Sequence, residues 1–253
     1  ALLAIATAIV KLIGAFYKLP LNMAIGAEGY SYFTTAYDIY SVMLLISTAG
    51  LPVAVSRMIS QASTLEHYTR MRKIFRTSLT MFAIMGALTS VLMIFGAKPL
   101  ANVMNQPDAW VSIACLGPCG ILICLMSAYR GYFNGQGNMA PTSVTQVIEA
   151  FIKLVVGLAL AFAIIRATQS VAMAAGGAIL GVTVSCLVSV IYLSGKQAKE
   201  YRQLPQTDEA VSGYGSTIKQ LLAIAVPITI GSAGLQLLTM LETKIYMGRL
   251  LQF

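Results

Sequence analysis

The sequence predicts an all-α, polytopic membrane protein, and three observations support this fold class. The first is composition, because 57% of the 253 residues are hydrophobic and only 10% are charged, against roughly 25% charged in soluble domains. The second is a set of long uncharged stretches, at residues 77–97, 109–129, 167–195 and 220–241. The third is their length, since about 20 apolar residues in a helix cross the hydrocarbon core of a bilayer.

Seven membrane spans are expected along the chain, with bounds set by charges, turns and prolines. A turn at 26–29 separates the first two spans, and a proline-bearing loop at 97–108 follows the third. Pro141 suits the start of the fifth span, because the first turn of a helix does not use its N–H. The expected spans are about residues 1–25, 30–62, 74–96, 109–132, 141–166, 171–194 and 217–247.

The polar segment 195–216 divides the chain into two unequal parts. It carries Pro205, Gly213 and Gly215, which are residue types typical of loops and linkers. We therefore expect a six-helix N-terminal lobe at 1–194, a cytoplasmic inter-lobe linker at 195–216 and the first helix of a second lobe at 217–253. The chain begins without methionine and both ends lie at apolar runs, so we expect a fragment of a longer protein.

The basic residues predict how the chain is oriented in the membrane. The formal net charge is +8, but the bases lie at the ends of apolar spans, which indicates a membrane surface rather than nucleic acid. Because Lys and Arg concentrate in cytoplasmic loops, we expect the even-to-odd loops and the N-terminus to be cytoplasmic. The bases expected in those loops are Arg70, Arg72, Lys73, Arg130, Lys196, Lys199 and Arg202.

Polar side chains recur at helical spacing inside three of the expected spans. Ionisable groups at membrane depth cost at least about 2.5–3.5 kcal/mol each on insertion scales, so they normally face a bundle interior or a watery cavity. We therefore expect one polar cavity between these helices. The three polar faces consist of Lys11 and Lys18, of Tyr30, Thr34, Tyr37, Asp38 and Ser41, and of Thr142, Gln146, Glu149 and Lys153.

A structural interpretation of the same charges stays open. Glu149 and Lys153 stand four residues apart, a spacing at which opposite charges pair on one helix. Lys18 lies near the end of its span, from where its amine can extend to the membrane interface. Lys11 is harder to explain in this way, because no acid lies near it in its own span.

Glycine, proline and small residues predict how the helices bend and pack. Proline inside a helix removes a backbone hydrogen bond and kinks it, so we expect breaks at 50–52, 117–118 and 227. A stripe of small residues in the sixth span permits close contact with another helix. This stripe comprises Gly177, Gly181, Ser185 and Ser189.

The cysteines and the single histidine give little support to an enzyme. No histidine stands near the cysteines, and His67 lies in an expected loop, so we expect packing roles rather than a metal site. A hydrolase or transferase would need clustered acids, bases or metal ligands, and acids are sparse here. The cysteines are Cys115, Cys119, Cys124 and Cys186.

Several runs of residues carry a family resemblance that extends from residue 1 to about 250. They are KLIGAFYKLP at 11–20, AYDIY at 36–40, STAGLPVAVS at 47–56, YRGYFNGQGNMAPT at 129–142 and QVIE at 146–149. Together they resemble the polysaccharide biosynthesis and export branch of the multidrug/oligosaccharidyl-lipid/polysaccharide flippase superfamily. Within that branch the chain is most similar to the stage V sporulation protein B and lipid II flippase-like group of Gram-positive bacteria.

The resemblance implies two six-helix lobes that form a V around a central cavity in the bacterial cytoplasmic membrane. It implies that the cavity carries an undecaprenyl-pyrophosphate-linked sugar to the outer leaflet by alternating access. Relatives line the first helices of this cavity with basic side chains for the pyrophosphate, often arginine, where this chain has Lys11 and Lys18. Leu241-Glu242 stands where relatives commonly have Ile-Asp, which leaves an ion-coupling role open.

The leading hypothesis is therefore a flippase for a lipid-linked cell-wall or polysaccharide precursor, without a cofactor and with the coupling ion, Na⁺ or H⁺, undecided. Lys11, Lys18 and Arg57 would hold the pyrophosphate. The remaining expected site residues, which would line the cavity, are Tyr37, Asp38, Gln146, Glu149 and Lys153. Expected partners are the lipid-linked oligosaccharide, membrane lipids and cell-wall synthesis proteins, and no nucleic acid.

Two alternatives stay open at this point. One is a cation-coupled multidrug exporter of the same superfamily, whose cavity should be more acidic. The other is a membrane enzyme or a scaffold of a wall-synthesis complex, whose activity should not depend on the cavity charges.

Overall fold

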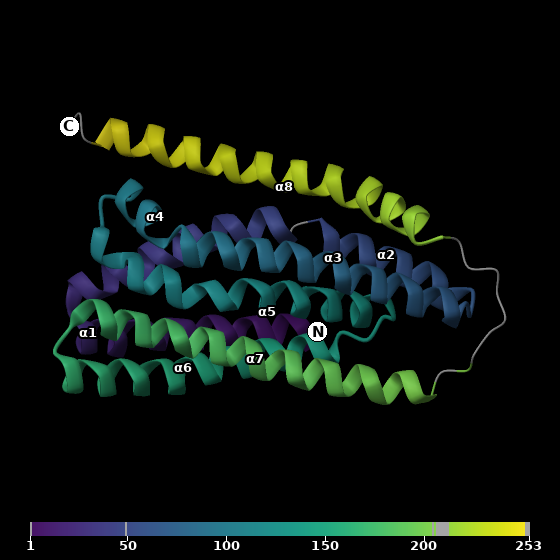
Figure 1. The fold of residues 1–253 in the computed structure, drawn as a ribbon, viewed down its shortest axis with the longest axis horizontal. Helices are drawn as coiled ribbons and strands as arrows, with labels where there is room; N and C mark the ends of the chain where they lie inside the picture. The colour runs from purple at the N-terminus through teal and green to yellow at the C-terminus, as the bar shows by residue number, and fades with distance from the viewer. Residues whose placement is uncertain (1, 49, 204, 206–212, 251–253) are drawn as a thin grey trace.

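The computed structural model is a bundle of long helices aligned with the long axis of the molecule, and its described residues include no strand (Figure 1). The structure describes residues 2–48, 50–203, 205 and 213–250, with side chains at 3–42, 50–203, 205, 213–232 and 234. The elements are α1 Leu2–Thr48, α2 Leu51–Thr64, α3 Tyr68–Phe95, α4 Ala97–Val103, the 3-10 helix η1 Pro107–Ala109, α5 Trp110–Gly135, α6 Ala140–Thr168, α7 Val171–Gln203 and α8 Tyr214–Leu250.

Helix α1 consists of two arms that meet at Gly26. Gly26 has φ 71° and ψ 176°, a backbone conformation that is almost restricted to glycine. The chain reverses there, and the second arm returns toward the region where the first arm begins (Figure 1). The rings of Tyr17 and Phe33, one from each arm, lie with their centroids 5.9 Å apart. The two expected spans on either side of residues 26–29 are therefore present.

The span expected at 30–62 is divided near its middle. Helix α1 ends at Thr48, and α2 begins at Leu51 with Pro52 in its first turn. The interruption of this span expected at 50–52 is confirmed, because proline starts a helix more readily than it continues one. Gly50 is buried at this break, and a Cβ on it would lie 2.0 Å from the Ala225 carbonyl oxygen of α8.

Two segments expected to be loops contain helix in their described residues. Residues 97–108 contain α4 and the start of η1, and Pro99 lies in the first turn of α4, where its missing N–H costs nothing. Helix α7 continues through 195–203, because this stretch is rich in Lys, Gln, Ala and Glu, which favour helices. The division of the chain into two lobes stays a prediction.

Five segments in the described part of the chain are long and apolar enough to cross a membrane. The first contains both arms of α1, so these segments correspond to the first six expected spans. They are Leu3–Val42, Tyr68–Phe95, Pro107–Gly135, Ala140–Thr168 and Val171–Gln203.

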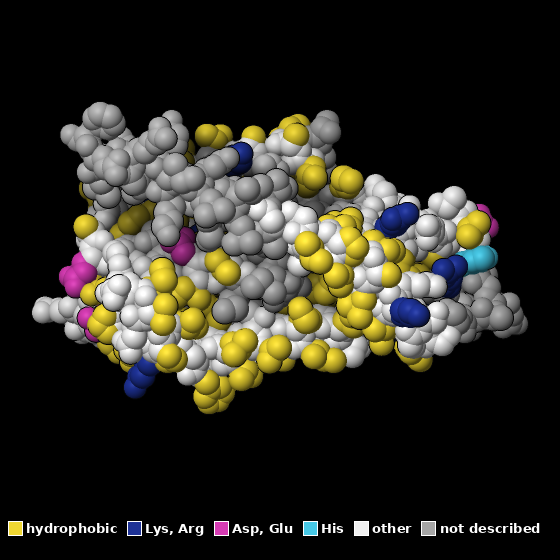
Figure 2. All heavy atoms as spheres, turned by 90° about the horizontal axis from the view of Figure 1, so that it is seen from above, with side chains coloured by type: hydrophobic (Ala, Val, Ile, Leu, Met, Phe, Trp, Pro, Cys, Tyr) yellow, Lys and Arg dark blue, Asp and Glu magenta, His cyan; other side chains and the backbone are white. Residues whose placement is uncertain are grey.

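The outer surface of the bundle is apolar. Phe16, Met23 and Phe95 are exposed, and hydrophobic side chains cover much of the face shown in Figure 2. Soluble monomers rarely expose apolar surface of this extent. The surface therefore indicates that lipid surrounds these helices.

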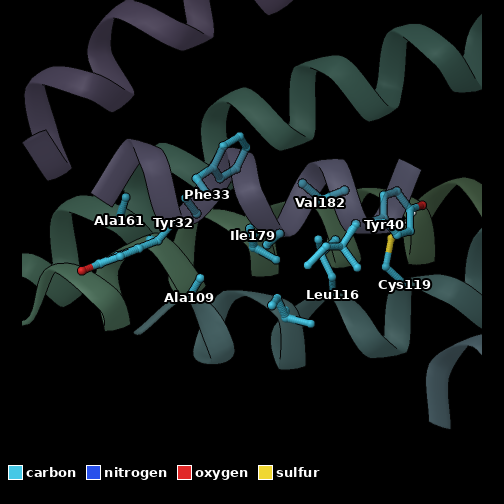
Figure 3. Close-up of a cluster of buried hydrophobic side chains, with 14 of the residues drawn as sticks. Tyr32, Phe33, Tyr40, Ala109, Leu116, Cys119, Ala161, Ile179 and Val182 are labelled. Atoms are coloured by element: carbon cyan, nitrogen blue, oxygen red, sulfur yellow. Dashed lines mark hydrogen bonds between the residues drawn. The ribbon is translucent and has the colours of Figure 1, made fainter. Parts of the chain in front are cut away.

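Two buried clusters hold the bundle together. One joins α1 to α5 and α7, where Tyr40 of α1 lies beside Cys119 of α5, and Leu116 and Val182 lie in the same layer (Figure 3). The other joins α2, α3, α5, α7 and α8, and its members include Met58, Phe82, Tyr132, Leu193 and Leu221.

Helices α6 and α7 approach each other closely because small residues line their contact. A Cβ on Gly181 would lie 2.4 Å from Gly157 Cα, and one on Gly177 would lie 2.4 Å from Ile164 Cδ1. The packing role expected for these two glycines of the small-residue stripe is confirmed.

Basic residues of α3 contact residues near both ends of the 195–216 region. Arg72 donates a 3.0 Å hydrogen bond to the Tyr201 carbonyl oxygen, and the Lys73 amine lies 4.3 Å from the centroid of the Tyr214 ring. The expected second-to-third and sixth-to-seventh loops thus lie at the same end of the bundle. Which side of the membrane this end faces stays a prediction.

Candidate functional site

Two adjoining cavities lie between the arms of α1 and helix α6. The first, which we name the Glu149 cavity, has a volume of about 350 Å³ and reaches α5 and α7. The second, the Lys18 cavity, has a volume of about 690 Å³ and lies mainly between the two arms of α1. The residues that line both cavities are Gly14, Tyr17, Tyr37 and Lys153.

The Glu149 cavity contains an ion pair between α5 and α6. The Arg130 guanidinium contacts the Glu149 carboxylate and also donates hydrogen bonds of 3.0 and 3.3 Å to Thr145 Oγ1. The two charged side chains are 19% and 23% exposed. The interpretation that Glu149 pairs with Lys153 is therefore wrong, because α5 brings a guanidinium to the carboxylate instead.

Arg130 was expected in a cytoplasmic loop, and that placement is also wrong. Helix α5 continues to Gly135, so Arg130 lies within the helix and its side chain lines the cavity. A signal for this position was present in the sequence, because Arg130 precedes the expected end of the fourth span at residue 132.

Lys153 lies where the two cavities meet, and its amine is surrounded by aromatic rings. The Nζ atom is 4.6 Å from the ring centroid of Tyr37, 5.2 Å from that of Tyr17 and 5.9 Å from that of Phe33. Each distance lies within the range of a cation–π interaction. Among the described residues, no carboxylate forms an ion pair with this amine.

The Lys18 cavity brings together the predicted polar faces of the two arms of α1. Lys11 and Lys18 come from the first arm, and Tyr37 and Asp38 come from the second. Both lysines are exposed. Within the described part of the chain, neither has a hydrogen-bond, ion-pair or ring partner, so their amines are available to a ligand.

Two buried polar atoms of the Glu149 cavity have no hydrogen-bond partner among the described residues. They are the hydroxyl oxygen of Tyr17, whose side chain is 3% exposed, and Oε1 of Gln146. A buried polar group without a partner costs about 1–3 kcal/mol. The cavity wall is therefore prepared to form hydrogen bonds with a polar ligand.

The model of the polysaccharide biosynthesis protein family matches residues 1–252 of this sequence. The chain belongs to this family. Similar proteins include the lipid II flippase MurJ of Bacillus subtilis (strain 168), 23% identical over 96% of this chain and 48% of the relative. Stage V sporulation protein B of the same organism is 25% identical over 87% of this chain and 43% of the relative. The chain thus spans a little under half the length of these relatives.

Solved structures of the MOP superfamily share the fold of this family member. A multidrug resistance MATE family transporter in an outward-facing conformation aligns with a TM-score of 0.73, over 93% of this chain and 53% of its own. At 16% identity this likeness concerns the fold alone. The predicted fold class, an all-α polytopic membrane protein, is confirmed, and the chain resembles a lobe of these transporters.

Some residues of the predicted site lie outside the two cavities. Arg57 is exposed on α2 and lines neither cavity, so its contact with a pyrophosphate stays a prediction. Thr142 is buried and donates a 2.7 Å hydrogen bond to Asn134 Oδ1, which gives it a structural role at the turn before α6. Glu242 lies outside the residues whose side chains are described.

The buried cysteines pack against one another in the described part of the chain. Cys119 Sγ lies 3.4 Å from Cys186 Sγ and 3.7 Å from the Tyr40 hydroxyl. The described residues contain no group of three His, Cys, Asp or Glu side chains that would hold a metal ion.

Sequence reasoning missed the aromatic wall of the site. Tyr17 and Phe33 were not among the predicted residues, yet both contact the Lys153 amine. The spacing offered one signal, because Phe33 lies three residues after Tyr30 and four before Tyr37, and therefore on the same helix face.

Proposed function

We propose that this chain forms a lobe of a flippase that moves an undecaprenyl-pyrophosphate-linked precursor across the cytoplasmic membrane by alternating access. The observation that carries the proposal is the charge of the two cavities. Four basic side chains line them against two carboxylates, and Arg130 already neutralises Glu149. This excess of positive charge favours a ligand with an anionic headgroup.

Lys11 and Lys18 are the proposed contacts for the pyrophosphate. A lysine amine is a compact point charge and a good partner for phosphate oxygens, although it lacks the bidentate fork of arginine. The two side chains are seven residues apart on one helix face and line the same cavity, so both amines can approach one diphosphate. Tyr37, Asp38 and Gln146 would then hydrogen-bond to sugar hydroxyls.

Replacement of Lys11 and Lys18 by glutamine tests this proposal. The full-length protein with both changes should fail to restore growth of a strain depleted of its lipid II flippase, and should fail to flip a labelled lipid-linked sugar in proteoliposomes. Lys98→Gln is the matched control, because Lys98 lies against the Trp110 ring and lines neither cavity. Normal flipping by the double variant would refute the role of these lysines.

The same variants separate the alternatives. An organic-cation exporter should tolerate or gain from the loss of two positive charges in its cavity, and its substrates should compete in transport assays. A scaffold of a wall-synthesis complex should support growth regardless of the cavity lysines. The basic lining of the described cavities favours the anionic substrate over both.

A further inference from the structure

The three rings around Lys153 form an aromatic cage, composed of Tyr17 and Phe33, which are buried, and Tyr37, which is partly buried. The rings of Phe33 and Tyr37 lie 5.9 Å apart with an interplanar angle of 20°, and Tyr17 lies 5.9 Å from Phe33 at 55°. Both arms of α1 therefore contribute to one cage. Aromatic cages of this kind recognise quaternary ammonium groups and other organic cations.

The cation in this cage belongs to the protein itself. Lys153 extends from α6, and all three rings lie within 6 Å of its amine. Glu149, one helical turn away, is engaged by Arg130. Asp38 lines the Lys18 cavity together with Lys153, but among the described residues neither carboxylate forms an ion pair with this amine. The cage is thus filled by a cation that cannot diffuse away.

We propose that the cage of Tyr17, Phe33 and Tyr37 is a binding site for small organic cations, and that the amine of Lys153 occupies this site in their place. Lys153 is therefore a specificity-determining residue. The lysine excludes quaternary ammonium compounds from the point where the two cavities meet. This inference goes beyond the proposed function, because it concerns a second ligand class and does not depend on which lipid-linked substrate is carried.

Removal of the amine should therefore open the cage. Lys153→Ala removes both the amine and the aliphatic stem that fill the cage, and it leaves the three rings in place. We expect this variant to bind tetraethylammonium at least about tenfold more tightly than the unchanged protein, which equals about 1.4 kcal/mol. A gain of this size lies within the range of cation–π interactions at desolvated sites.

Matched variants distinguish the cage from the general charge of the cavity. Lys18→Ala removes an amine from the wall of the same cavity, but among the described residues Lys18 makes no cation–π contact with the three rings, so it should give less than about a twofold gain. Lys153→Arg should leave the cage filled and give no gain. Lys153→Ala combined with Tyr37→Ala should lose the gain, because the ring nearest to the amine is absent.

The experiment measures binding of radiolabelled tetraethylammonium to the purified complete chain in lipid nanodiscs. Thermal unfolding of each variant verifies that it is folded, and Lys153→Ser replaces Lys153→Ala if the latter is not. A gain specific to loss of the Lys153 amine supports the proposal. No gain in folded Lys153→Ala, or an equal gain in Lys18→Ala, overturns it. Because binding is measured without a lipid-linked substrate, this inference and the flippase proposal can fail separately.

Discussion

The ion pair between Arg130 and Glu149 offers a quantitative test of the site geometry. Removal of one partner from a buried ion pair typically costs about 3–5 kcal/mol, because the other charge is left uncompensated. Here the side chains are 19% and 23% exposed toward a cavity, where water and counter-ions soften the penalty. We therefore expect Arg130→Met and Glu149→Leu each to lower the free energy of unfolding by about 2 kcal/mol.

The double variant should lose less than the sum of the two single losses. With both charges absent, neither is buried without a partner, and apolar side chains of similar volume often replace a buried pair at little cost. We expect Arg130→Met with Glu149→Leu to lose only about 1 kcal/mol, which gives a coupling energy of about 3 kcal/mol. The loss that remains reflects the hydrogen bonds from Arg130 to Thr145.

Equilibrium unfolding in mixed micelles, followed by the helical circular dichroism signal, measures these free energies. Lys98→Met is the control, since Lys98 is exposed and lies away from the pair, and it should change stability by less than about 0.5 kcal/mol. Additive losses of about 4 kcal/mol in the double variant would contradict the direct pairing of Arg130 with Glu149 and with it the arrangement of α5 on α6.

Two further predictions concern the arms of α1. Gly26→Ala should lower the free energy of unfolding by about 1–3 kcal/mol, because Gly26 has a positive φ. Gly14→Ala is the control and should not destabilise the protein, because a Cβ at Gly14 would meet open space. Equal melting temperatures for the two variants would count against a reversal of the chain at Gly26. Gln106 donates a 2.7 Å hydrogen bond to Ser31 and accepts one of 2.8 Å from Thr35, so Gln106→Ala should lower the free energy of unfolding by about 1–2 kcal/mol in the same assay. A loss below about 0.3 kcal/mol would exclude these contacts.

The membrane-spanning helices could be predicted from sequence because their signal is local. An uncharged run such as 77–97 identifies a span by length and hydropathy alone, and Gly50 with Pro52 identified the break at 50–52. The breaks expected at 117–118 and 227 are wrong, because α5 and α8 continue through these prolines. The ends of helices were less predictable. Helix α7 continues to Gln203 because nothing in 196–203 ends a helix, and the polarity of this stretch was mistaken for that of a linker.

The partners of the charged residues could not be predicted from sequence in the same way. Periodicity placed Glu149 and Lys153 on one face of α6, but the choice of partner depends on how α5 and α1 pack against that face. Arg130 precedes Glu149 by 19 residues and Phe33 precedes Lys153 by far more, so both contacts are tertiary. A pattern read along one helix contains no information about such neighbours.

These tertiary contacts determine which charges remain for a ligand. Arg130 is engaged by Glu149, and the amine of Lys153 is held by three rings. Among the described basic residues of the two cavities, Lys11 and Lys18 are left without a protein partner. Stability and anion binding should therefore be separable: changes at Arg130 alter the folding free energy, whereas changes at the two lysines of α1 alter ligand binding with little effect on folding.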